Sequence, residues 1–285
     1  MFSGQTKEPP LFYDEINHGD HIVLFFHGFP FDRTMWLEAG SCLKSPCRLI
    51  FPDMRGFGKT TLPVSRTTSM LQFANDAANL IHYIDDHVTN DNTSKITLCG
   101  LSMGGYVALH FVKYFSDHFK GRLAGLILCD TKSQADSEAA AQNRRNRADS
   151  LPEKGLATLA DAMIPNLFAP QTGENPRQNV REMIMRQPIP GVAAADRGMA
   201  DRPDMTEWLP DFTLPTLVLC GEQDMISPVE EIKCMSEQLP NSRFIAIPNA
   251  GHLPPIESPK NFSRAVENFL AETGGELPTE ISNHS

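Results

Sequence analysis

A Gly-x-Ser-x-Gly pentapeptide at residues 100–104 lies directly between a strand-like run and a helix-like run. The strand-like run is 95–99, and the helix-like run is 106–112. A serine at such a sharp strand-to-helix turn adopts a strained backbone conformation, and its hydroxyl group points out of the fold. The pentapeptide alone would also fit an ordinary glycine-rich turn. Its context predicts that Ser102 is a nucleophile.

A serine hydroxyl group needs a base that removes its proton and a third group that orients the base. Asp224 follows the apolar run 216–220, and His252 follows the run 243–248. Both residues come just after an expected strand, where open α/β sheets collect their active-site groups. We therefore predict that His252 is the base and that Asp224 is the acid that orients it. Glu222 and Asp130, which ends another strand-like run, remain alternatives for the acid.

The apolar run 21–26 is typical of a buried strand, and it stops at the sequence His27-Gly28-Phe29. The backbone N–H groups of Phe29 and Met103 are predicted to bind the oxyanion, and each such donor is worth about 2.7–4 kcal/mol. We expect His27 to support this loop and not to act as a base. We place His27, Gly28 and Trp36 beside the substrate, although Trp36 fits the core equally well.

These motifs, in this order along the chain, resemble the α/β-hydrolase family and in particular its small-ester and enol-lactone hydrolases. The matching segments extend from about residue 20 to about residue 270. The resemblance implies an α/β fold with a mostly parallel eight-stranded sheet, helices on both faces and a helical cap. The order Ser, Asp, His is also that of this family. The family's 53–58 stretch is usually a structural turn, so we interpret Asp53 and Arg55 as an internal ion pair.

Strand-like and helix-like runs alternate along most of the chain, which predicts parallel strands joined by right-handed crossovers. The strand-like runs are 21–26, 47–51, 95–100, 123–129, 216–221 and 243–248, and the helical runs are 69–87, 103–119, 229–239 and 259–272. The segment 133–212 interrupts the alternation with four helical stretches, at 134–147, 155–163, 180–186 and 192–199. We expect a core domain of residues 1–132 and 213–285, with 133–212 as a helical cap.

The composition restricts the partners of the chain. A length of 285 residues fits one large α/β domain. A net charge of −10 argues against nucleic acid as a partner. The apolar runs are far shorter than the ~20 residues of a membrane span, so no membrane partner is expected. The first ten residues lack the apolar segment of a secretory signal, which favours a cytoplasmic location. The sequence does not indicate an oligomeric state.

The six cysteines do not form a disulfide framework at this length, although Cys42 and Cys47 could pair on oxidation. The usual Cys and His spacings of metal sites are missing, so we expect no metal, and the mechanism needs no cofactor. In the cap, Arg144, Arg145 and Arg147 form either a solvated helix face or a site for an acidic group.

We expect a serine hydrolase that cleaves a small carboxylic ester or lactone through an acyl-enzyme. Three alternatives use the same fold: a cofactor-free perhydrolase of the haloperoxidase type, a hydrolase of C–C bonds, and a ligand-binding receptor. Dehalogenases of this fold use a carboxylate nucleophile, so Ser102 argues against that reaction.

Overall fold

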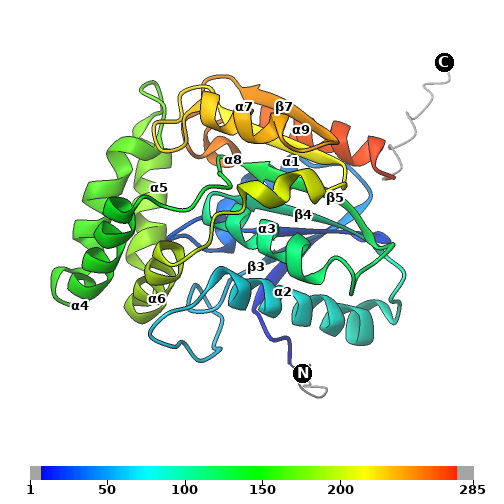
Figure 1. The fold of residues 1–285 in the computed structure, drawn as a ribbon, viewed down its shortest axis with the longest axis horizontal. Helices are drawn as coiled ribbons and strands as arrows, with labels where there is room; N and C mark the ends of the chain where they lie inside the picture. The colour runs from blue at the N-terminus through cyan, green and yellow to red at the C-terminus, as the bar shows by residue number, and fades with distance from the viewer. Residues whose placement is uncertain (1–7, 275–285) are drawn as a thin grey trace.

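The computed structural model describes residues 8–274, which form a mixed sheet with helices on both sides (Figure 1). The strands of the described chain are β1 (Tyr13–Ile16), β2 (His21–Phe26), β3 (Cys47–Pro52), β4 (Lys95–Leu101), β5 (Leu123–Cys129), β6 (Thr216–Gly221) and β7 (Ser242–Ile247). Their order in the sheet is β1-β3-β2-β4-β5-β6-β7. β1 is antiparallel to β3, and every other pairing is parallel. The expected fold class is confirmed, with seven strands in the described residues instead of eight.

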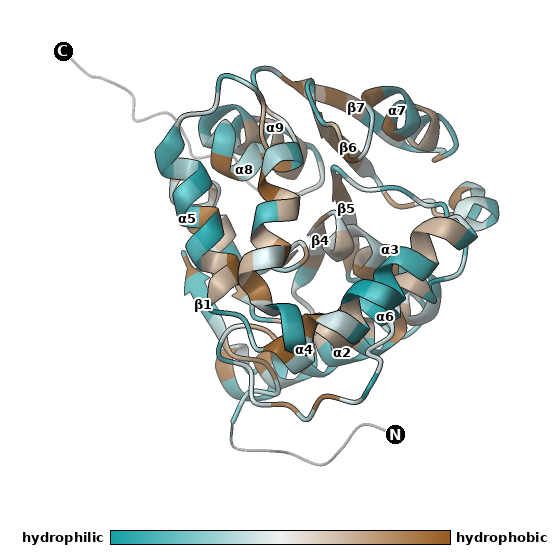
Figure 2. Cartoon of the chain, turned by 90° about the vertical axis from the view of Figure 1, so that its left-hand side faces the viewer, coloured by the Kyte–Doolittle hydropathy of each residue, from teal (hydrophilic) through white to brown (hydrophobic). Residues whose placement is uncertain are grey.

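The inner strands are apolar runs because helices cover both faces of the sheet. All six residues of β2 are buried, and Figure 2 shows β5, β6 and β7 mainly in brown. Neighbouring residues of β2 face opposite layers, as the pleat of a strand requires. Phe25 contacts the Trp36 ring on one face, whereas Phe26 borders Gly104 on the other.

The helices that cover the sheet are α1 (Leu37–Cys42), α2 (Met70–Ile84), α3 (Met103–Phe115), α7 (Val229–Glu237), α8 (Pro254–Glu257) and α9 (Pro259–Glu272). α2 and α3 pack against each other, and α1 packs against α9. Short helical turns precede α1, follow α2 and precede β6, at Arg33–Trp36, Asp85–Thr89 and Thr206–Asp211. The expected helix at 259–272 has the observed bounds, and the others agree to within a few residues at their ends.

Three helices between β5 and β6 lie together beside the sheet, on the left in Figure 1. They are α4 (Glu138–Leu167), α5 (Glu174–Met185) and α6 (Ile189–Ala200), and we call residues 133–212 the helical insert. The two stretches expected at 134–147 and 155–163 form one element with a kink at Gly155. Gly155 has φ 73°, a conformation that glycine adopts easily.

The arginines near the start of α4 form ion pairs that connect the helices of the insert. Arg147 donates two hydrogen bonds to Asp196 of α6, of 2.7 and 2.6 Å, and Arg144 lies 3.4 Å from the same carboxylate. Arg145 contacts Asp201 at 2.9 Å. The expected solvated face is therefore only half-exposed, because acidic residues in α6 and beside it pair with these arginines.

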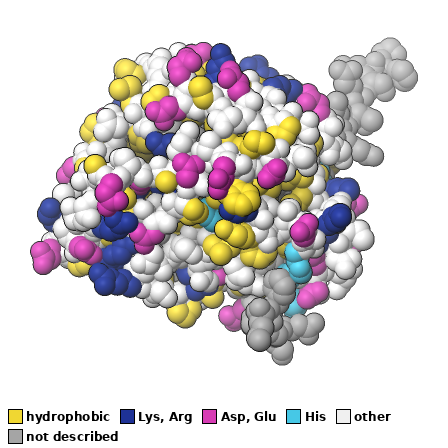
Figure 3. Space-filling view, in the orientation of Figure 1, with side chains coloured by type: hydrophobic (Ala, Val, Ile, Leu, Met, Phe, Trp, Pro, Cys, Tyr) yellow, Lys and Arg dark blue, Asp and Glu magenta, His cyan; other side chains and the backbone are white. Residues whose placement is uncertain are grey.

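Within residues 8–274, no helix is long and apolar enough to cross a bilayer. Basic and acidic side chains are interspersed on the face shown in Figure 3. Cys42 and Cys47 are both free thiols. The expectation about a secretory signal rests mainly on residues 1–7, which lie outside the described residues.

Candidate active site

Ser102 occupies the turn between β4 and α3 in a conformation that only a constrained site maintains. Its φ is 54° and its ψ is −114°, and a non-glycine residue with such a φ costs on the order of 1–3 kcal/mol. The Ser102 N–H group donates to the Cys129 carbonyl at 2.9 Å, and the Thr131 hydroxyl group donates to the Ser102 carbonyl at 2.8 Å. The end of β5 therefore supports the strained turn.

Glycines flank the turn where other backbone segments leave no space for a side chain. A Cβ atom on Gly104 would lie 2.0 Å from the Phe26 carbonyl oxygen, and one on Gly100 would lie 2.2 Å from the Gly104 carbonyl oxygen. Because both neighbours are backbone atoms, neither can rotate away. The two glycines of the pentapeptide are therefore required by packing.

We expect Gly104→Ala to destabilise the fold by about 1–3 kcal/mol, since the added methyl group overlaps the end of β2. Gly173→Ala is the matched control, because a Cβ atom there meets no heavy atom within 4 Å. Its effect is expected to stay within about 0.5 kcal/mol. Urea unfolding of both variants measures the difference, and equal stabilities would contradict the close approach at Gly104.

Asp224 and His252 form a buried hydrogen-bonded pair at the ends of β6 and β7. The distance from His252 Nδ1 to Asp224 Oδ2 is 2.8 Å. The other carboxylate oxygen accepts the N–H groups of Ile226 and Ser227, at 2.8 and 3.1 Å. Burial alone would raise the pKa of Asp224, but the charge and hydrogen bond of His252 lower it below its ordinary value. An ionised Asp224 holds the proton on Nδ1 and leaves Nε2 without one.

The Glu257 carboxylate holds the loop that carries His252. It accepts the N–H groups of Gly251 and Leu253 at 2.9 and 3.2 Å, and that of Ala169 in the helical insert at 2.8 Å. Sequence reasoning missed this residue, because nothing distinguishes Glu257 from other acidic residues near a helix start. Its contacts join the His252 loop to the insert.

The loop after β2 contains the two remaining predicted contributors, Gly28 and Phe29. The His27 ring is fully buried below it, donates from Nδ1 to the Gly28 carbonyl at 3.0 Å, and accepts the Met54 N–H group at Nε2 at 3.1 Å. Because Nε2 accepts a hydrogen bond the ring is neutral, and burial lowers the pKa of His27 in the same sense. Among the hydrogen bonds of residues 8–274, none uses the N–H group of Phe29 or Met103.

Two residues that we placed beside the substrate belong to the interior instead. Both nitrogen atoms of His27 are occupied by backbone groups, so it supports the loop and offers no atom to a ligand. Trp36 has no exposed surface, and its ring centroid lies 5.2 Å from that of Phe25 and 5.9 Å from that of Phe262. The substrate-contact predictions for His27 and Trp36 are therefore wrong, and that for Gly28 stays a prediction.

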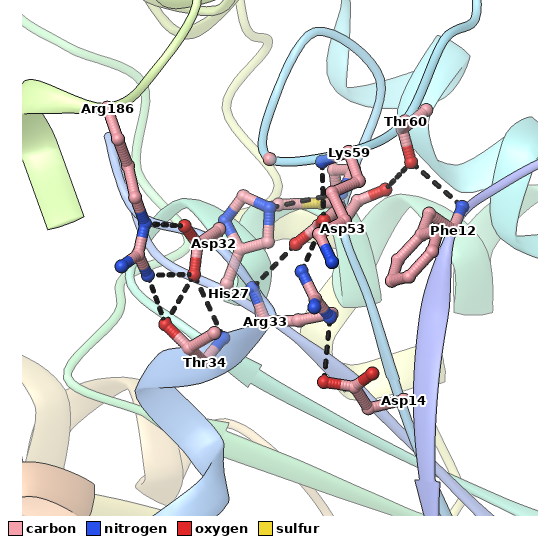
Figure 4. A network of polar contacts seen from close by, with 12 residues as sticks. Phe12, Asp14, His27, Asp32, Arg33, Thr34, Asp53, Lys59, Thr60 and Arg186 are labelled. Atoms are coloured by element: carbon pink, nitrogen blue, oxygen red, sulfur yellow. Dashed lines mark hydrogen bonds and ion pairs between the residues drawn. The ribbon is translucent and has the colours of Figure 1, made fainter.

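An ion-pair network shown in Figure 4 fixes the same loop. Asp53 accepts hydrogen bonds from the Arg33 guanidinium group at 2.8 Å and from the Lys59 N–H group at 2.7 Å. Arg55 turns the other way and binds Asp76 of α2. The expected Asp53–Arg55 pair is therefore wrong, because each residue has a closer partner on another segment.

Asp32 connects this loop to the helical insert. It accepts hydrogen bonds of 2.7 and 2.9 Å from Arg186, which follows α5 (Figure 4). Burial alone would raise the pKa of Asp32, but the hydrogen bonds from Arg186, Thr34 and Gln187 lower it well below its usual range. The loop and the insert are thus held together by an ionised carboxylate.

We expect Asp32→Asn to destabilise the protein by about 1–3 kcal/mol at pH 7, since hydrogen bonds to a charged group are lost. The pKa of Asp32 is lower in the folded than in the unfolded state, so its stabilisation is complete above the unfolded value of about 3.9 and is lost as the pH falls below it. The difference from wild type in urea unfolding is therefore expected to stay constant above about pH 5 and to shrink progressively as the pH falls below about 4.

Asp161→Asn is the matched control for this prediction, because Asp161 forms an exposed ion pair with Arg181. Such pairs contribute about 0.2–1 kcal/mol. A difference between Asp32→Asn and wild type that does not change with pH would contradict the ionic role of Asp32.

Of the predicted residues, the structure brings Asp224 and His252 into direct contact. Ser102 follows β4, which is separated from β6 by β5 alone. A parallel sheet with such a serine turn and a buried Asp–His pair defines a hydrolase-type α/β fold. Residues 23–265 match the model of the alpha/beta hydrolase family. The chain belongs to this family.

Several known proteins are similar over nearly the whole chain. An esterase from Thermogutta terrifontis, whose structure is described as malate bound, is 42% identical with a TM-score of 0.85, covering 92% of this chain and 93% of that one. The 3-oxoadipate enol-lactonase 1 of Acinetobacter baylyi is 25% identical over 87% of this chain and 88% of its own length. A putative 2-succinyl-6-hydroxy-2,4-cyclohexadiene-1-carboxylate synthase of Bacillus subtilis is 28% identical over 90% and 93%. The predicted resemblance to ester and enol-lactone hydrolases is confirmed.

Proposed function

We propose that the protein is a serine hydrolase of small carboxylic esters or lactones, with Ser102 as the nucleophile. The observation that carries this proposal is the buried hydrogen bond between His252 and Asp224 at the sheet edge where the strained Ser102 lies. The similarity to an esterase over more than nine-tenths of both chains supports the same reaction class.

In this mechanism Ser102 attacks the substrate carbonyl while His252 takes its proton and later gives it to the leaving alkoxide. Asp224 stays ionised and stabilises the imidazolium ion. The N–H groups of Phe29 and Met103 bind the oxyanion, and a water molecule activated by His252 releases the acyl group. In residues 8–274 the Ser102 hydroxyl group has no hydrogen bond to His252, a contact that often forms only when substrate is bound.

We further propose that the helical insert is a cap over the core formed by residues 1–132 and 213–285. Two contacts support this role. Arg186 binds Asp32 in the loop that carries Phe29, and the Leu167 carbonyl accepts the His252 N–H group at 2.9 Å. An insert held both at the Phe29 loop and at the His252 loop restricts the space for the acyl group. We therefore expect compact acyl groups to be favoured.

A panel of p-nitrophenyl esters of increasing acyl length, beside a set of lactones, tests this proposal. We expect turnover of short acyl chains, little turnover of long ones and no activation at an oil–water interface. Half-esters of dicarboxylic acids carry a free carboxylate and belong in the panel as well. Arg147 is a basic residue near the proposed oxyanion loop, since its guanidinium group lies 5.6 Å from the centre of the Phe29 ring.

The panel also separates the alternatives. Turnover only with peroxide or with C–C substrates would assign the site to perhydrolysis or C–C cleavage, and binding without any turnover would indicate a receptor. The cytoplasmic location expected from the sequence stays a prediction.

A further inference from the structure

A third carboxyl group, that of Asp130, lies beside the Asp224–His252 pair and is not used by the proposed mechanism. Asp130 directly follows β5, has no exposed surface, and holds a φ of 46°. Polar side-chain atoms of Asp130, Asp224 and His252 all lie within 4.8 Å of one another. The question for a carboxyl group buried at this place is whether it is ionised or protonated.

The contacts of Asp130 indicate that one of the two neighbouring carboxyl groups is protonated. Its Oδ1 accepts the Gly221 N–H group at 2.8 Å, and the Cys129 Sγ atom lies 2.9 Å from its Oδ2. A carboxyl oxygen of Asp130 also lies within 4.8 Å of one of Asp224. Two carboxylates buried this close together repel each other, so one of the two groups keeps its proton, and the protonated group can donate a hydrogen bond to the other.

The surroundings assign the proton to Asp130. Asp224 accepts hydrogen bonds from the imidazole of His252 and from two backbone N–H groups, all of which favour its ionised form. Among the hydrogen bonds of residues 8–274, the Asp130 carboxyl group accepts one from a backbone N–H group and one from the Cys129 thiol, a weak donor. Burial and the charge of Asp224 raise the pKa of Asp130 well above its ordinary value.

We propose that Asp130 is a neutral carboxylic acid that donates a hydrogen bond to Asp224 and holds this carboxylate in position against His252. This inference rests on the proposed role of Asp224 as the orienting acid. Asp130 acts through Asp224 and is therefore a positioning residue. The added donor gives the Asp224 carboxylate one more contact besides those of His252, Ile226 and Ser227, and so helps to hold it in line with Nδ1.

Two substitutions distinguish the effect of losing the Asp130 hydrogen bond from the effect of changing the backbone conformation. Asp130→Asn keeps a donor of the same shape and tolerates a left-handed φ. Asp130→Gly removes the side chain and adopts the same φ without strain. Asn90→Gly is the control for the backbone change, because Asn90 is exposed on another loop with φ 50°. Thermal unfolding establishes that each variant is folded.

With an activated ester, we expect Asp130→Asn to lower kcat by less than about threefold. Asp130→Gly is expected to lower kcat on the order of 10-fold to 100-fold with little change in KM, as for loss of a hydrogen bond to a charged group. Asn90→Gly is expected to match the wild type. A loss for Asp130→Asn as large as that for Asp224→Asn would make Asp130 the ionised acid and overturn the proposal. Wild-type turnover by Asp130→Gly would overturn it too.

Two measurements do not depend on turnover and so separate failure of this inference from failure of the proposed function. The infrared carbonyl band of a protonated carboxyl group is expected at pH 7 in wild type and in Ser102→Ala, and not in Asp130→Asn. The low-field proton resonance of His252 Nδ1 is expected to shift in Asp130→Gly. If the band is missing from the wild type, or if a chelator abolishes activity that zinc then restores, the proposal fails.

Discussion

Replacing Ser102 by alanine is expected to abolish ester hydrolysis and to leave the fold intact. The Ser102 hydroxyl group is the proposed nucleophile, and loss of such a group costs on the order of 10⁶ in kcat in a well-studied serine protease. The side chain is only partly buried, so the truncation removes little packing. Steady-state kinetics on a short p-nitrophenyl ester measure the effect, and circular dichroism establishes the fold.

Two further variants sharpen this test. Ser102→Gly removes the same hydroxyl group and fits the φ of 54° without strain, so it is expected to be equally inactive. Ser116→Ala, just past the other end of α3, is expected to keep full activity. A fluorophosphonate probe is expected to label Ser102 and no other residue. More than a tenth of wild-type activity in a folded Ser102→Ala protein would refute the nucleophile assignment.

The parts of the fold that were predictable from the sequence are those with one dominant signal. Strands buried on both faces give continuous apolar runs, so the bounds of β2 and β5 could be predicted closely. The edge strand β1 was missed because its sequence, Tyr-Asp-Glu-Ile, is short, polar and half-buried. Two helical stretches, 134–147 and 155–163, were expected where the structure has one element, α4, which continues through residues 148–154 and is kinked at Gly155.

The candidate site was predictable where position along the chain decides function. Residues just after parallel strands meet at one sheet edge, so Asp224 and His252 could be placed together without a structure. Side-chain direction was not predictable in the same way. Trp36 and His27 lie near the site in sequence but turn into the core, because packing decides that choice. Partners distant in sequence, such as Arg186 for Asp32, leave no local pattern at all.

Asp224→Asn is expected to lower kcat about 10⁴-fold, because an amide favours the wrong imidazole tautomer; a comparable change in a serine protease has this effect. The Asp224 carboxylate accepts the His252 Nδ1 proton at 2.8 Å, whereas an amide at the same place can present its NH₂ group to Nδ1. The proton would then move to Nε2, and the base would be blocked. The loss is expected in kcat, with KM nearly unchanged, since Asp224 is buried beneath His252 and does not reach the substrate.

The control for this prediction is Glu222→Gln, which changes an acid two residues away in the same loop. Glu222 is exposed and has no place in the hydrogen bonding of His252, so the variant is expected to lose less than about twofold. Urea unfolding of both variants separates an effect on catalysis from one on stability. If Glu222→Gln or Asp130→Asn proves to be the severe change and Asp224→Asn the mild one, the orienting acid is not Asp224. In that case the 2.8 Å contact with His252 serves the structure of the loop and not the reaction.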